Sequence, residues 1–228
     1  MKYIPSIAFE DMSGSVKGVT AAKVKSRKYI RNRGYGGSTR TNYQASVKAV
    51  FKQLSQAWKG LTNAQILAWN AAANTSEGRS VLGTKSRISG CNLFMRLNYW
   101  VVYCGGQIMT AVPTLAGIEA PADATVALTA SAMTFTLADV PADVTNLKLV
   151  ILASEPQGNS ITRAYSKAAA FDDPVTPVST AIDIKAKYDA KCGAPSAGYP
   201  MVFFKYFFVN TATGEKSGEK MASAVLSA

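Results

Sequence analysis

The chain has 228 residues, a formal net charge of +11 and no histidine. Hydrophobic residues make up 48% of it, which is enough for a buried core and argues against a disordered chain. The lack of histidine removes the commonest general base and the usual zinc ligand, so we expect no enzyme activity, no metal and no cofactor. Three cysteines, Cys91, Cys104 and Cys192, are too few and too scattered for a disulfide framework.

The apolar stretches are too short for a membrane helix, which needs roughly 20 apolar residues. The N-terminus reaches Glu10 and Asp11 before the apolar core of a secretory signal could form. We therefore expect a protein that is made in a cytoplasm and has no contact with a membrane.

The charge is distributed unevenly along the chain. Residues 1–109 hold 16 Lys and Arg against three acidic residues, a net charge of +13, whereas residues 110–228 hold 9 against 11, a net charge of −2. This asymmetry predicts two regions with different partners.

The densest basic stretch runs from Lys23 to Arg33, and we expect a basic β-hairpin or arm over residues 1–40. Such a segment can contact nucleic-acid phosphates or an acidic protein surface, because lysine and arginine respond to negative charge of any origin. A solvated hairpin that contacts nothing is the alternative. The candidate contact residues are Lys23, Lys25, Arg27, Lys28, Arg31, Arg33 and Arg40.

Three helices are predicted over residues 41–109. Capping boxes at Thr41–Gln44 and Thr62–Gln65 each mark a helix start, with Gly60 in the turn between the two helices. A glycine- and serine-rich loop is expected over residues 76–90, and a third helix should then run to the pair of glycines at 105–106.

Large apolar side chains recur at spacings of three and four in this region, which predicts one buried stripe on each helix. The three tryptophans could instead line a ligand-binding box, but aromatic residues at helical spacing normally pack in a core. The predicted helical core consists of Phe51, Leu54, Trp58, Trp69, Leu97 and Trp100.

Residues 110–228 contain short β-branched or alternating runs separated by turn residues. This pattern predicts an all-β sandwich of the immunoglobulin or fibronectin type, so the expected fold class is α+β. The acidic pair Asp172-Asp173 could be part of a calcium site, but it supplies too few oxygen ligands, which favours a solvated turn. The seven predicted strands are Ala124–Leu128, Met133–Leu137, Leu147–Ala153, Thr162–Ala169, Ala181–Tyr188, Met201–Asn210 and Glu219–Leu226.

Several elements of the N-terminal region occur in a characteristic order. A glycine-containing segment from Phe9 to Gly18 is followed by Arg31-Asn-Arg33, by Thr41-Asn-Tyr-Gln44 and by the run from Phe51 to Trp69 with its W…LT-x-x-Q…AW pattern. This order resembles a family of small structural proteins of tailed phages and prophages, over about residues 8–100. The segment before the first helix reads Gly36-Gly-Ser-Thr, where members of that family often have Asn-Pro-x-Thr.

The resemblance implies a virion structural component and no catalytic residues. Together with the charge pattern it predicts a multicopy ring or connector protein of the tail or head–tail junction, assembled in the host cytoplasm. The expected partners are copies of the chain and other virion proteins of the portal, tail or capsid. A capsid decoration protein is one alternative. A nucleic-acid-binding protein that contacts DNA through the basic arm is another.

Overall fold

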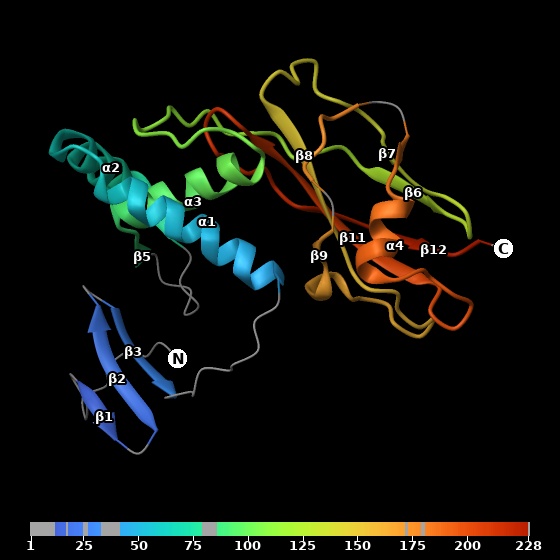
Figure 1. The fold of residues 1–228 in the computed structure, drawn as a ribbon, viewed down its shortest axis with the longest axis horizontal. Helices are drawn as coiled ribbons and strands as arrows, with labels where there is room; N and C mark the ends of the chain where they lie inside the picture. The colour runs from blue at the N-terminus through green and yellow to red at the C-terminus, as the bar shows by residue number, and fades with distance from the viewer. Residues whose placement is uncertain are drawn as a thin grey trace.

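The computed structural model describes residues 12–16, 18–24, 27–32, 42–78, 86–171, 173–178 and 181–227, and its fold is α+β. Figure 1 shows the helices α1, α2 and α3 beside the strands of the C-terminal half. None of the helices in the described part of the chain is long and apolar enough to cross a membrane.

The N-terminal part forms a three-stranded antiparallel sheet. Its strands are β1 (Gly14–Val16), β2 (Val19–Val24) and β3 (Arg27–Asn32), in the order β1-β2-β3. The predicted basic hairpin is therefore present as β2 and β3, with β1 added at one edge.

Two helices follow, α1 (Asn42–Lys59) and α2 (Asn63–Thr75). The predicted capping box of α2 is confirmed, because the Gln65 N–H donates to Thr62 Oγ1 (3.3 Å) and the Thr62 N–H donates to Gln65 Oε1 (2.9 Å). The corresponding box at the start of α1 depends on Thr41, which lies outside the described residues.

The third helix, α3 (Gly90–Tyr103), starts at Ser89, whose hydroxyl accepts the Asn92 N–H. It ends at the predicted glycines, where Gly106 N–H bonds Val101 O (2.8 Å) and Gly105 N–H bonds Val102 O (3.0 Å). This is the Schellman pattern, and Gly105 supplies the positive φ of 80° that it requires. The predicted loop before α3 also contains a two-residue ladder, β4 (Glu77–Gly78) with β5 (Ser86–Arg87).

The helical core confirms part of the predicted stripe. Leu54, Trp69 and Leu97 are buried, and Trp58 packs partly buried against them. Phe51 was placed in the core wrongly, since it is 43% exposed at the edge of the stripe, where it stacks on Tyr99.

The C-terminal half contains two antiparallel sheets around one core. The first has the order β10-β7-β6 and consists of β6 (Ala124–Leu128), β7 (Met133–Leu137) and β10 (Ile182–Asp183). The second has the order β12-β11-β8-β9 and consists of β8 (Leu147–Ala153), β9 (Ala169–Ala170), β11 (Met201–Asn210) and β12 (Lys220–Val225). Side chains of both sheets meet in the largest apolar cluster, which includes Phe135 and Phe204.

Two of the seven predicted strands are wrong. Residues 162–168 form an irregular segment with a short 3₁₀ helix (Tyr165–Lys167), and of the predicted strand only residue 169 is extended, as the first residue of β9. Residues 181–188 form β10 and then the start of helix α4 (Lys185–Cys192). The alternation of this second segment imitates a strand, but Ile184 and Tyr188, four residues apart, are both buried, which is helical spacing.

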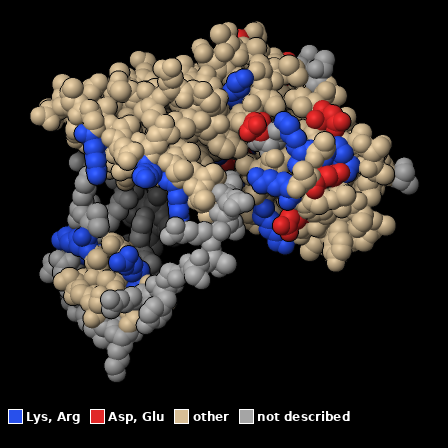
Figure 2. Space-filling view, in the orientation of Figure 1, with Lys and Arg blue, Asp and Glu red and all other residues tan. Residues whose placement is uncertain are grey.

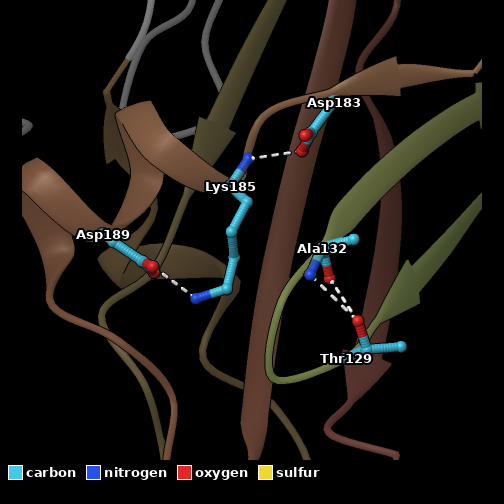
Figure 3. A network of polar contacts seen from close by, with 5 residues as sticks. All are labelled: Thr129, Ala132, Asp183, Lys185 and Asp189. Carbon is cyan, nitrogen blue, oxygen red and sulfur yellow. Dashed lines mark hydrogen bonds and ion pairs between the residues drawn. The ribbon is translucent and has the colours of Figure 1, made fainter.

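Polar contacts hold α4 at the edge of the first sheet, as Figure 3 shows. The Lys185 N–H donates to Asp183 Oδ1 (2.9 Å), and Lys185 Nζ forms an ion pair with Asp189 one turn along the helix. Beside it, Thr129 and Ala132 close the β6–β7 turn through the Thr129 hydroxyl. The Ile184 N–H bonds Met133 O (2.9 Å), so the start of α4 extends the edge of the sheet.

The helical and β regions meet at a joint made by Trp100, Tyr103 and Cys104 of the α3 end with Val150 and Phe207 of the second sheet. The rings of Trp100 and Phe207 meet edge to face, with centroids 5.1 Å apart. Trp100 therefore belongs to this joint, and the prediction that placed it in the helical core is wrong. Both faces of β11 are buried because one faces the β core and the other is covered by the joint, which explains its nearly continuous apolar sequence.

A basic and aromatic candidate interface

The predicted contact residues of the N-terminal sheet do not share one face. Lys23 and Lys28 are directly opposite each other on β2 and β3, so they point to the same face. Arg31 lies three residues after Lys28 on the same strand and points to the other face, opposite Thr20.

The remaining predicted contact residues cannot be placed in the same way. Arg27 contributes its backbone to β3, opposite Val24. Lys25, Arg33 and Arg40 lie outside the described residues.

A second basic surface lies on α1. Lys48, Lys52 and Lys59 are exposed, and their spacings of four and seven place them on one stripe of the helix. These lysines are not among the contact residues predicted from the sequence. The feature of the sequence that could have identified this basic surface is that α1, α2 and α3 contain no acidic residue.

This absence makes the surface of the helical region different from that of the β region. Figure 2 shows Lys and Arg without Asp or Glu between them over the helical part, whereas both signs alternate over the C-terminal part. In the sequence, Glu77 is the single acidic residue between positions 12 and 118. The helical surface is therefore suited to an anionic partner.

Aromatic rings run from α1 across α3 to β11. Phe51 stacks on Tyr99 (5.5 Å between centroids), Tyr99 meets Trp100 edge to face (5.2 Å), and Trp100 continues to Phe207. Lys216 completes the row, with its ammonium 3.9 Å from the centroid of the Phe207 ring. These contacts fix the position of α3 against the second sheet.

Two neighbouring hollows share Arg96 and Trp100 and together form what we call the α3 groove. The first has a volume of about 330 Å³ and lies between α1 and α3. The second has a volume of about 670 Å³ and lies between α3, residues 115–118 and the β11–β12 connection. The lining residues are Phe51, Asn92, Met95, Arg96, Leu97, Tyr99, Trp100, Leu115, Gly117, Ile118, Gly214, Glu215 and Lys216.

Among the charged groups that line the groove, Glu215 and Lys216 are engaged in contacts of their own, and Lys216 is paired with Glu219. Glu215 accepts the Gly117 N–H (3.1 Å) and the Thr213 hydroxyl (3.1 Å), so it holds the groove wall. Arg96 is exposed on the outer face of α3 and has no ion-pair partner among the described residues. The groove thus offers apolar walls and a cation, which suits a partner that carries a carboxylate next to apolar side chains.

The pKa values of the three cysteine thiols are shifted by burial. Burial raises the pKa of the Cys104 thiol to about 11, and burial also raises the pKa of Cys91 and Cys192. These thiols are protonated near neutral pH and are therefore weak nucleophiles.

The described residues also contain no group of three or more Cys, Asp and Glu side chains placed to hold a metal ion. Of the acidic pair that had suggested calcium, Asp173 is exposed and Asp172 lies outside the described residues.

Comparison of this chain with protein-family models, with curated proteins and with solved structures gave no match.

Proposed function

We propose that this chain is a non-enzymatic structural component of a tailed-phage virion, namely a multicopy ring or connector protein of the tail or head–tail junction. The observation that carries the proposal is the separation of charge between its two regions. Helices α1 and α3 bear lysine and arginine and none of the three helices bears a carboxylate, whereas the β region holds most of the acidic residues. A chain with two surfaces of opposite character can pack against its copies and against acidic neighbours in a particle.

The small size of the helical core supports the same proposal. Its cluster has seven buried side chains, and such a core is marginal by itself. Burial of the exposed Phe51 and its neighbour Tyr99 against a neighbouring subunit would stabilise the helical core. The order of N-terminal sequence elements, which resembles small virion proteins, points in the same direction.

For the C-terminal half we propose an immunoglobulin- or fibronectin-like sandwich that projects from the particle or packs between subunits. Two antiparallel sheets with a common core support this assignment. The helix α4 and the short strands β9 and β10 would then be local departures from that architecture.

The mass distribution of the purified chain tests the proposed ring. After nuclease treatment, light scattering at low and at high salt should find one discrete higher oligomer, and electron microscopy should show closed rings. A monomer at both salt concentrations would contradict a self-assembling ring and would favour a capsid decoration protein.

Nucleic-acid binding is a second candidate, favoured by the paired lysines Lys23 and Lys28 of the N-terminal sheet. Binding through phosphates should weaken steeply as salt is added. Replacing Lys23 and Lys28 by glutamate should then reduce the affinity for DNA of any sequence. Affinity that does not depend on salt would exclude this candidate.

A further inference from the structure

We propose that the α3 groove binds the acidic loop at residues 138–146 of a second copy of this chain. The inference rests on the multicopy assembly of the proposed function and names the contact that would build it. Neither hollow of the groove is lined by a residue of this loop from the same copy, so within one molecule the loop does not fill the groove.

The loop has the chemistry that the groove requires. It connects β7 to β8 and reads Ala-Asp-Val-Pro-Ala-Asp-Val-Thr-Asn, so its two carboxylates alternate with apolar residues. Asp139 and Asp143 are exposed, and neither forms an ion pair with a described residue. No lysine or arginine occurs between Arg96 and Lys148, so nothing in this segment neutralises them.

The loop is also held in shape before any partner binds. Asp139 Oδ1 accepts the Val140 N–H (2.8 Å), and Asp143 Oδ1 accepts the Thr145 N–H (3.0 Å). The second bond lowers the pKa of Asp143, because it favours the ionised form of the carboxylate. A preformed loop loses little conformational freedom when it binds.

The groove presents the complementary groups. Arg96 lies where its two hollows meet and supplies the cation for a loop carboxylate. Lys216, above the rings of Phe207 and Trp100 on the far wall, is already paired with Glu219 and contributes its aliphatic stem. Phe51 and Leu115 are 43% and 45% exposed and provide apolar surface for the valines and the proline of the loop. Each copy thus carries one groove and one loop, and repeated groove-to-loop contact joins copies into an assembly.

The test uses two variants of the full chain that each disable one side of the contact. Arg96→Glu reverses the charge of the groove at an exposed position. The double substitution Asp139→Asn with Asp143→Asn removes the loop charges but keeps the oxygen that accepts each backbone N–H. Sedimentation velocity over a range of concentrations measures self-association, and circular dichroism checks that each variant is folded.

We expect either variant alone to associate at least about tenfold more weakly than the unchanged chain. An equimolar mixture of the two should form one-to-one pairs, because the intact loop of one fits the intact groove of the other. The matched controls are Arg163→Glu, an exposed arginine of the β region outside the groove lining, and Glu155→Gln, an exposed carboxylate outside the loop. Both should associate like the unchanged chain.

Three results would overturn the inference: an unchanged chain that is monomeric at every concentration, variants that associate like the unchanged chain, or a mixture that does not pair. Rings that persist in both variants would refute the groove contact and leave the proposed ring intact. If copies pair through groove and loop but never form a closed ring, the groove contact stands and the proposed ring is refuted.

Discussion

The helical region and the β region bury very different amounts of apolar surface. Among the described residues, the β core has fifteen buried residues around Phe135 and Phe204, whereas the helical core has seven around Trp69 and Phe94. The helical region adds a cationic surface and a groove. The comparison indicates that the β region supplies most of the stability and that the helical region supplies the surface for partners.

The largest effect should come from the β core. Phe204 is fully buried and meets Phe135, so Phe204→Ala should lower the free energy of unfolding by about 3–5 kcal/mol. Thermal and urea unfolding followed by circular dichroism measures this loss. Met221→Ala, at a position 53% exposed on β12, is the control and should change the stability by less than about 0.5 kcal/mol. Equal losses would show that the core does not dominate stability.

The next largest loss of stability should come from a close contact beside the joint, between Gly214 and α3. Gly214 has a φ of +70°, and a Cβ there would collide with the backbone of Leu97 on α3. Gly214→Ala should cost about 2–4 kcal/mol, from backbone strain and overpacking together. Gly117 has a similar φ of +79° but open space around it, so Gly117→Ala shows the strain alone. Calorimetry measures the loss of stability in both variants, and the difference between the two losses is the contribution of packing between Gly214 and α3. Equal losses would contradict close packing at this position.

Within the helical region, the side-chain amide of Asn98 should make a large contribution to stability. Asn98 is fully buried and bonds the Met109 N–H (2.6 Å) and the Met109 carbonyl (3.3 Å), which ties the segment after α3 to the helix. Asn98→Ala should cost about 2–3 kcal/mol, because it leaves buried backbone groups without partners. Hydrogen exchange at the Met109 amide should accelerate. Asn92→Ala, exposed on the same helix, should leave that exchange unchanged.

The smallest effect concerns acid stability. A hydrogen bond from Lys216, together with the charges of Lys216 and Lys205, lowers the pKa of Glu219 below its ordinary value of 4.5. The folded state therefore favours the ionised form, and this stabilisation is present above pH 4.5 and is lost as the pH falls below it. In Glu219→Gln, stability should decline less steeply below pH 4.5. Because the carboxylate is 37% exposed, the difference should be small and should shrink in high salt.

Local patterns could be read from the sequence where neighbouring residues determine the structure. The Thr62–Gln65 capping box and the glycines after α3 satisfy backbone groups within a few residues, so their outcome does not depend on the rest of the fold. The long apolar run of β11 was also found, because few structures other than a strand buried on both faces explain it.

Tertiary contacts decided the elements that the sequence pattern missed. The helix α4 depends on Tyr188, whose hydroxyl donates to Ser154 O (2.8 Å) far along the chain. Asn98 has the spacing of the buried stripe, four residues after Phe94, but an amide in that stripe carries no signal until its partner Met109 is placed. The groove is likewise invisible in the sequence, because α1, α3 and residues 115–118 approach each other only in the fold.

The aromatic residues of the two regions also differ in kind. All three tryptophans, Trp58, Trp69 and Trp100, belong to the helical region or its joint, whereas the aromatic residues of the β core are phenylalanine and tyrosine. Tryptophan emission is therefore an intrinsic optical reporter of the helical region alone. Trp100, set against Phe207 and Lys216, should sense any movement between helix and sheet during assembly, without an added label.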